Sequence, residues 1–495
     1  MFDCRTVFAS STRFLWYAIV ILYMLHLLDE KIGCFLLRKE RMARDFCRDK
    51  VNDTRHEVHI IVSRGLNLSL SGTPSSRDEE RVHCSSFSID FRPFRGAHWQ
   101  LLIREGEALL PGQPVAKERK SGVLFTTPVE AKVSAIVRGE KRALCEVILR
   151  PLSYEVAPVK EDLFQRDAQS LLSYMCLHGL VSGIRVRPFS QLVHPDKLPR
   201  SIFIQAVESA PFIPAAEWQV AGREEAFGIG VRLLRQLTDS VHLVTQDPFF
   251  QELGQSLPVD LHTIQGPHPM ASPSLHIQHI DPIMKMTDIV WSLSALEVVR
   301  LGHYCMTGQL WIDQLVAIAG EGFPTQRYVR TFPGVAISDC IEDPGSRVRL
   351  VSGDPLTGSV VGINDHLCGG DSVISAIPEP SEERKWLHFF RWNRSFSRAN
   401  GSRRCQDIAM TTDQHGEERA FIDGSLYEKV MPFHVIPILL VKALLADDME
   451  KAVEYGLLEI VPEDFALADF ISPSKSRMME IVRDGQSRFL SVCLS

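Results

Sequence analysis

The chain has 495 residues, of which 45% are hydrophobic and 23% are charged. This composition excludes a wholly disordered or multi-span membrane protein, and the length predicts about three domains. The net charge of −7 argues against a dedicated nucleic-acid-binding protein. The 11 cysteines are irregularly spaced and form no C-x-x-C pair, so we expect reduced thiols rather than disulfides, zinc ribbons or iron–sulfur ligands.

The amino terminus contains one long apolar run, Phe14 to Leu28 (FLWYAIVILYMLHLL). Its 15 residues fall short of the roughly 20 that a membrane-spanning helix needs. A membrane anchor, a secretion signal, or upstream sequence translated from a wrong start codon all fit this pattern. We favour the third interpretation, with Met42 as one alternative start. Residues 1–57 are then expected to be an extension, either a start-site artefact or a disordered, hydrophobic segment.

Residues 58–155 show short strands separated by turns, which indicates an all-β domain. The segment from Glu105 to Val115 has the spacing E-G-x5-G-Q-x-V and is similar to biotinyl/lipoyl-like barrel-sandwich domains. A carrier of that fold needs a lysine at a hairpin tip flanked by acidic residues or methionine. Lys117, Lys120 and Lys132 lack this context, so we expect a docking module. A carrier modified at Lys117 or Lys120 is a third hypothesis.

The rest of the chain divides into four parts. Residues 156–195 are expected to be a linker with a helix. Residues 196–322 alternate apolar five-residue strands with helices, which predicts a parallel α/β domain whose strands include 201–207, 241–245 and 315–319. Residues 323–380 predict a compact α+β module, and residues 381–495 a carboxyl-terminal region with helical hairpins, including a helix from Met449 to Tyr455 capped by Asp447.

The α/β domain carries no recognisable cofactor motif. No G-x-G-x-x-G follows the strand 201–207, and Walker, G-x-S-x-G and H-E-x-x-H motifs are absent from the sequence. The loop Gly320–Thr325 (GEGFPT) echoes the flavin loop of Nqo1-type NADH-oxidising subunits. It has only two glycines and follows the domain instead of its first strand, so we do not expect it to cradle phosphate.

A histidine cluster and a basic-aromatic stretch are two further candidates. His262, His268, His276 and His279 lie within 18 residues, but three prolines divide this segment. We therefore expect a loop and strand with hydrogen-bonded imidazoles, without the helical i, i+3 geometry of a metal site. Residues 384–404 interleave arginines with tryptophan and phenylalanine. Ordinary strands are the preferred interpretation, with a membrane, partner or nucleic-acid contact as the alternatives.

Several motifs occur in an order that resembles one known family, the NqrA subunits of the bacterial Na+-translocating NADH:quinone reductase complex. The resemblance covers residues 58 to about 485. Its motifs are IVSRGLNL (61–68), GPHPMASPSLHI (266–277), LVAIAG (315–320), RYVRTFPGVAISD (327–339), SGDPLTG (352–358) and YEKVMPFHVIPILLVKALLADD (427–448).

The resemblance implies an α+β multidomain protein. The implied parts are a barrel-sandwich hybrid domain, a Rossmann-like α/β domain, a β-grasp SLBB domain and a helical end. It further implies a peripheral subunit on the cytoplasmic face of the bacterial inner membrane, in an expected six-subunit assembly that couples NADH oxidation and ubiquinone reduction to sodium export. FAD, FMN, riboflavin and the iron–sulfur centre are expected in partner subunits.

The same resemblance implies that this subunit is not active alone and has been associated with quinone binding. The related RnfC protein of the Rnf complex has cysteine runs for two clusters, whereas the corresponding segment here, FISPSKSRM (470–478), has no cysteine. No residue matches a motif that identifies a catalytic, cofactor-binding or metal-binding role, so we name none. The alternative function is a soluble flavin-binding NADH dehydrogenase subunit of the Nqo1 or RnfC type that uses residues 320–325.

Overall fold

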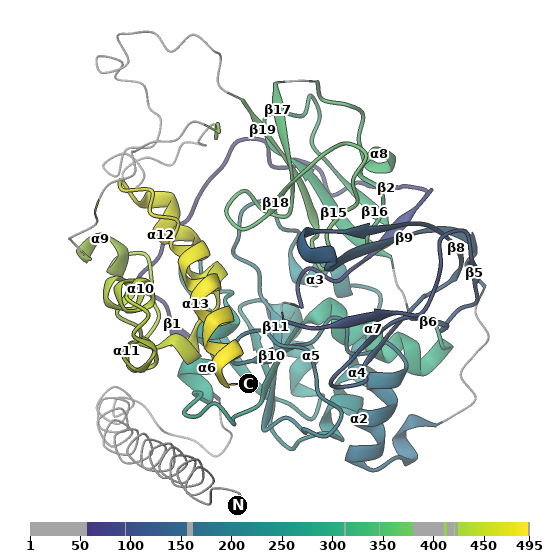
Figure 1. Ribbon diagram of the computed structural model, residues 1–495, viewed down its shortest axis with the longest axis horizontal. Coiled ribbons are helices and arrows are strands. Elements are labelled where there is room, and N and C mark those ends of the chain that lie inside the picture. Colours follow the sequence, from purple (N-terminus) through teal and green to yellow (C-terminus); the bar gives the residue numbers. More distant parts are fainter. Residues whose placement is uncertain are drawn as a thin grey trace, which may run out of the picture. The chain divides into compact units, whose positions relative to one another are not determined.

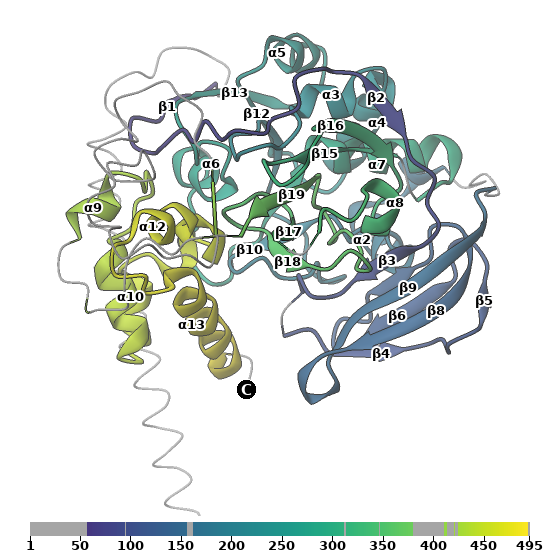
Figure 2. The same ribbon diagram turned by 90° about the horizontal axis from the view of Figure 1, so that it is seen from above.

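The computed structural model describes residues 57–94, 96–155, 162–310, 313–345, 347–379, 410–412, 420 and 424–493 (Figures 1 and 2). The described residues form an α/β layer, two packed β-sheets, a third mixed sheet and a group of carboxyl-terminal helices. The apolar run Phe14–Leu28 and the basic-aromatic stretch 384–404 lie outside the described residues, so the predictions made for them stay predictions.

The α/β layer is built on a six-stranded sheet with the order β1-β13-β12-β11-β14-β10. The first five strands in this order are parallel, and β10 runs antiparallel to β14. Its strands are β1 (His59–Ile61), β10 (Arg185–Arg187), β11 (Ser201–Ala206), β12 (Val241–Thr245), β13 (Asp260–Gln265) and β14 (Val290–Ser294). The strands near 201 and 241 therefore confirm the parallel pattern read from the sequence.

The helices described in this layer are α2 (Ala168–Leu177), α3 (Ala216–Val220), α4 (Glu224–Arg235), α5 (Pro248–Gln255), α6 (Pro273–Ile280) and α7 (Ala295–Thr307). Four of these six helices, α2, α5, α6 and α7, begin at an aspartate or serine whose side chain caps the first turn. The Ser294 side chain accepts a hydrogen bond at the start of α7, and left-handed Gly308 ends it. Glycines let α4 and α7 approach closely, because a Cβ at Gly302 would lie 1.7 Å from the Ala226 carbonyl oxygen.

The barrel-sandwich part consists of two antiparallel sheets that enclose an aromatic core. One sheet contains β3 (Phe87–Asp90), β9 (Leu144–Ser153), β8 (Glu130–Arg138) and β5 (Ala108–Leu109), and the other contains β4 (Trp99–Leu101), β6 (Pro114–Glu118) and β7 (Leu124–Thr126). Phe91 and Phe125 pack their rings 5.3 Å apart, and Trp99 contacts both. Alternating inward side chains of both sheets thus produce the predicted all-β domain.

The third sheet is mixed and corrects one sequence-based assignment. Its order is β18-β17-β19-β15-β16-β2, with β2 (Glu79–Arg81), β15 (Gln314–Ala319), β16 (Arg327–Thr331), β17 (Val348–Ser352), β18 (Ser359–Val361) and β19 (Val373–Pro378), and the short α8 (Ile337–Cys340) lies beside it. The strand 315–319 was expected in the parallel α/β sheet. That expectation is wrong, because β15 pairs with β16 and β19.

A second strand, near the start of the described residues, also joins a sheet other than the expected one. Strand β1 belongs by sequence to the expected barrel-sandwich segment 58–155, yet it pairs with β13 of the α/β sheet. Strand β2, from the same expected segment, pairs with β16 of the third sheet, and β10, from the expected linker 156–195, pairs with β14 of the α/β sheet. These strands are short, and only their long-range partners determine the sheet that each joins. The six-part division of the chain otherwise stays a prediction.

The carboxyl-terminal helices pack on the α/β layer through one hydrophobic cluster that includes Ile60, Phe203 and Phe433. They are α9 (Ser425–Glu428), α10 (Pro437–Leu445), α11 (Met449–Glu454), α12 (Ala466–Ile471) and α13 (Met478–Cys493), and Figure 1 shows α10, α12 and α13 together. The cap of α11 is Asp448, whose side chain accepts from the Lys451 amide, and not Asp447 as expected.

A buried polar network reinforces this contact. The guanidinium of Arg187 donates to the Ser274 hydroxyl and to the Glu459 carbonyl oxygen, each at 2.9 Å. Ser274 in turn donates to Asp464 at 2.5 Å, and Ser272 donates to the other carboxylate oxygen at 2.6 Å. Arg187 is 1% exposed and Asp464 is 5% exposed, so Ser274 bridges two buried groups, and the charge of Asp464 favours the charged form of Arg187 against the effect of burial.

We expect Asp464→Ala to lower the free energy of unfolding by about 3 kcal/mol or more, because it leaves the buried Arg187 charge uncompensated. Chemical denaturation of the purified chain measures this change. Asp448→Ala is the matched control at a helix cap outside this buried network and should cost much less. Equal losses in the two variants would contradict the proposed importance of the buried pair.

Candidate functional site

The carboxyl edge of the α/β sheet is the place where this class of fold binds ligands. The strand order changes direction between β11 and β14, and the segment that follows β11 contains Glu208 and Ser209. The segment that follows β13 contains His268. Because β11 and β13 are both strands of the parallel part of the sheet, these two segments reach the same edge.

His268 is held by neighbours from three segments. The Ser209 hydroxyl lies 3.0 Å from His268 Nδ1 and accepts a hydrogen bond from the Ala271 amide. The His268 amide donates to the Asn67 side chain, and the His268 carbonyl oxygen accepts from the Leu66 amide. Burial lowers the pKa of the imidazole, which favours its neutral form. The site thus presents a neutral imidazole that these contacts hold in place.

Two carboxyl groups near this edge have strongly raised pKa values. Burial, reinforced by the charge of Asp354, raises the pKa of Glu208 to about 8. Burial also raises the pKa of Asp371 to about 7, against the hydrogen bond from Ser352 at 2.7 Å. Asp354 itself is 4% exposed and accepts from the Leu356 amide. The motifs around residues 65, 268 and 354 therefore converge on one region that can hold and release protons near neutral pH.

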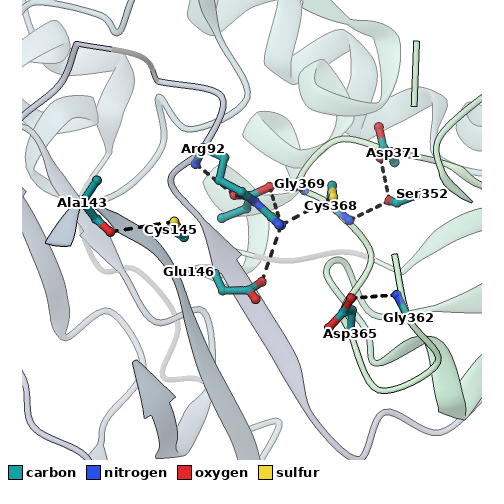
Figure 3. A network of polar contacts seen from close by, with 11 residues as sticks. Arg92, Ala143, Cys145, Glu146, Ser352, Gly362, Asp365, Cys368, Gly369 and Asp371 are labelled. Carbon is teal, nitrogen blue, oxygen red and sulfur yellow. Dashed lines mark hydrogen bonds and ion pairs between the residues drawn. The ribbon is translucent and has the colours of Figure 1, made fainter. Parts of the chain in front are cut away.

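A polar network joins the barrel-sandwich part to the third sheet (Figure 3). Arg92 donates to Asp90 at 2.8 Å, lies 3.5 Å from Glu146 and contacts the Cys368 sulfur at 3.4 Å. The Gly369 amide donates to Asp90, which closes the link between the two parts. Burial raises the pKa of the Cys368 thiol to about 11, so this thiol is protonated at neutral pH and is a poor nucleophile.

Carboxylates lie at the cap or in the first turn of three helices at the carboxyl edge, α4, α5 and α7. Glu224 and Glu225 lie in the first turn of α4, and Glu297 lies in that of α7. The Asp247 side chain accepts from the Phe249 amide at the start of α5. A phosphate group would have to approach these negative charges at the positions where it normally finds free amides.

The loop Gly320–Thr325 uses its amides within the fold. The Gly320 amide donates to the Gly72 carbonyl oxygen at 2.8 Å, and the Gly322 amide donates to Ala376 at 3.0 Å. A Cβ at Gly320 would lie 2.3 Å from the Ala376 carbonyl oxygen, at a φ of +102°. Close packing against β19 therefore explains these glycines, and nothing in the loop favours a flavin phosphate.

The four clustered histidines separate into different environments. Pro273 was expected to break the segment, but it occupies the first turn of α6, so His276 and His279 do lie on a helix at i, i+3. His276 donates through Nε2 to Met270, and burial lowers its pKa to about 4. Within the described ranges, no group of three or more His, Cys, Asp or Glu side chains is placed to hold a metal ion.

The three candidate lysines lie on the barrel-sandwich part. Lys117 and Lys132 are exposed on β6 and β8, and Lys120 lies in the turn between β6 and β7. The buried Glu118 carboxylate organises that turn by accepting from the Lys120 and Ser121 amides. Lys120 thus occupies a hairpin tip, but its neighbours in sequence remain unlike those of a carrier lysine.

Comparison with known proteins supplies the family. Residues 60–151 match the model of the NqrA N-terminal barrel-sandwich hybrid domain, and residues 166–310 match that of the NqrA second alpha/beta domain. Among curated proteins, the NqrA subunit of the Na(+)-translocating NADH-quinone reductase of Chlamydia caviae is 35% identical over 451 residues, which are 86% of this chain and 96% of that protein. The NqrA subunit of Yersinia pseudotuberculosis is 30% identical over 86% of this chain and 98% of its own.

The chain belongs to this NqrA family. The resemblance read from the sequence is thereby confirmed, as is a mixed α+β protein with a barrel-sandwich domain and a second α/β domain. Among solved structures, an NAD+-reducing NiFe-hydrogenase chain aligns with a TM-score of 0.32 and 12% identity over 44% of this chain and 48% of that chain, too low to support any argument.

No helix in the part of the chain that the structure describes has the length and apolarity needed to cross a membrane. His268 and Asp354 lie in motifs that were quoted for the family resemblance without a role, and sequence reasoning missed Glu208, Ser209 and Asp371. Only the raised pKa values of the carboxyl groups and the contacts between distant segments reveal these residues. The absence of any named site residue stays a prediction.

We expect Glu208→Gln to stabilise the fold at alkaline pH. The folded pKa of about 8 exceeds the unfolded value of about 4.3, so the native state binds more protons and its stability falls as the pH rises from about 4 to 8. Chemical unfolding at pH 5 and pH 9 should show the variant more stable than the wild type only at pH 9. Glu252→Gln, at an exposed position of α5, is the control. Parallel pH profiles of Glu208→Gln and the wild type would contradict the assignment.

Proposed function

We propose that this chain is a peripheral subunit, without a redox cofactor of its own, of a Na+-translocating NADH:ubiquinone reductase on the cytoplasmic face of the bacterial inner membrane. The observation that carries the proposal is the 30–35% identity to the curated NqrA proteins over nearly their whole length. The translocase activity belongs to the complete assembly, which couples NADH oxidation and quinone reduction to sodium export. The third sheet is then the SLBB β-grasp domain, and the helical end completes the protein.

The chemistry of the described residues supports a docking role. Helices α4 and α5 at the carboxyl edge have carboxylates at their first turn or cap. In the loop Gly320–Thr325, the amides of Gly320 and Gly322 donate to the carbonyl oxygens of Gly72 and Ala376. Neither feature suits a bound flavin or dinucleotide, so we place FAD, FMN, riboflavin and the iron–sulfur centre in partner subunits. The expected assembly has six subunits, and nucleic acid is not among the proposed partners.

We expect the tagged chain to co-purify with flavin-bearing membrane subunits when native membranes are extracted in mild detergent. The complex should show Na+-stimulated quinone reduction by NADH, whereas the chain alone should be colourless and inactive. A chain that starts at Val58 should assemble equally well, and its failure would instead identify residues 1–57 as an anchor. Quinone reduction by the isolated chain with NADH would overturn the proposal, and a flavin absorbance band would favour the flavoprotein alternative.

We also propose that the chain contributes to ubiquinone binding, and that His268, held by the neighbouring Ser209, makes the contact. In the tautomer in which Ser209 donates to Nδ1, the neutral ring of His268 carries its proton on Nε2, which is a suitable donor to a quinone carbonyl oxygen. The raised pKa of Glu208 supplies a protonated carboxyl group on the segment that bears Ser209.

We expect His268→Ala to raise the KM of the assembled complex for ubiquinone by about tenfold, the cost of one lost hydrogen bond. NADH oxidation with an artificial electron acceptor should be unchanged, because that step takes place in partner subunits. Ser209→Ala, which only frees the ring, should have a smaller effect. A normal KM for quinone in His268→Ala would reject the contact while leaving the family membership and the docking role intact.

A further inference from the structure

Two buried histidines on neighbouring strands connect β1 to the interior of the α/β sheet. We propose that His242 and His262 form an acid-sensitive latch, which holds β1 on the sheet when both rings are neutral and releases it when the pair takes up a proton. This inference concerns the strand that leads in from the amino-terminal extension, and it does not depend on the proposed function.

The latch is a continuous chain of hydrogen bonds. The Val58 amide donates to His262 Nδ1 at 3.0 Å, His262 Nε2 lies 3.0 Å from His242 Nδ1, and His242 Nε2 lies 2.8 Å from the Ser240 hydroxyl. His262 is 0% exposed and His242 is 6% exposed. The chain therefore runs from the edge strand through the buried pair to the start of β12.

The direction of these bonds fixes both tautomers. A backbone amide can only donate, so His262 Nδ1 must accept and its ring proton resides on Nε2. That proton is donated to His242 Nδ1, which leaves the His242 proton on Nε2, where it is donated to Ser240. Each ring thus has one accepting and one donating nitrogen, and each is neutral.

A second proton has no place in this arrangement. On His262 Nδ1 it would face the Val58 amide, donor against donor. On His242 Nδ1 it would face the Nε2–H of His262 in the same way. Asp260 Oδ2 lies 3.7 Å from His242 Nδ1 and favours protonation there, because a carboxylate stabilises the imidazolium. Protonation therefore turns His242 towards Asp260 and removes the acceptor that holds His262 in register.

The groups around His242 and His262 support a response of this pair to pH. The Phe203 ring of β11 covers His242 at 4.7 Å between centroids, and His59 of β1 contacts Thr263 at 2.5 Å, away from the pair. Among the charged side chains of the described residues, Asp260 lies against the latch. Strand β1 has only three residues and pairs only with β13 among the described strands, as Figure 2 shows at the edge of the sheet. Loss of the bond from the Val58 amide leaves β1 held by its ladder to β13 and by the bonds that flank it, from the Thr263 amide to Val58 and from the Val62 amide to Gln265.

Hydrogen–deuterium exchange of the full-length chain between pH 7.5 and pH 5.5 tests the latch. After correction for intrinsic exchange, we expect the peptide that covers residues 57–63 to exchange about tenfold faster at pH 5.5. The central strand β14 should be unchanged over the same range. Equal corrected exchange of residues 57–63 at the two pH values would overturn the proposal.

Two variants separate a latch from general acid loosening. His262→Asn keeps an oxygen near the Nδ1 position to accept from Val58 but cannot take up a proton there, so the pH response should be much reduced. Asp260→Asn removes the carboxylate that favours the imidazolium, so the transition should move to lower pH. A wild-type pH response in both variants would assign the effect to other groups and reject the latch.

Discussion

The buried guanidinium of Arg187 ties the carboxyl-terminal helices to the α/β sheet. It lies at the end of the edge strand β10, and its donors reach Ser274 at the start of α6 and the Glu459 carbonyl oxygen. Burial of a charge is costly, so the arrangement is stable only while Asp464 stays in place. Asp464 in turn accepts from Ser272, Ser274 and the Val461 amide. This bridged network therefore links the helical region to the α/β sheet, and the hydrophobic cluster that includes Phe433 packs the same contact.

Local patterns in the sequence identified the elements well but not their long-range partners. The strands expected over 201–207 and 241–245 form as β11 and β12, because each apolar run is decided within its own segment. The strand near 315 was recognised as a strand and placed in the wrong sheet. A five-residue apolar run fits a parallel or an antiparallel neighbour equally well, and β15 in fact has one of each. Sheet membership depends on residues far along the chain, which a local pattern does not contain.

At the candidate site, too, local motifs could be recognised from the sequence, whereas the contacts between them could not. The motifs around Gly65, His268 and Asp354 were recognised by their order along the chain, which does not say that they lie close together. Their convergence is a property of the tertiary fold, in which Gly65 has no room for a Cβ because the His268 carbonyl oxygen would lie 2.3 Å away. The error over α6 has a local cause instead. Proline ends a helix when it lies in the interior but is well tolerated in the first turn, and Ser272 before Pro273 is a capping residue that marks such a start.

The docking role proposed for this chain rests on where its amides and carboxylates lie. Carboxylates lie in the first turns of α4 and α7, and the glycines of the loop at 320 serve close packing against β19. The strand order that creates a ligand edge in this class of fold is present. The groups at that edge include His268 and Glu208, whose pKa values burial shifts so that the neutral forms are favoured. We therefore expect this edge to suit an uncharged polar ligand better than a phosphate group.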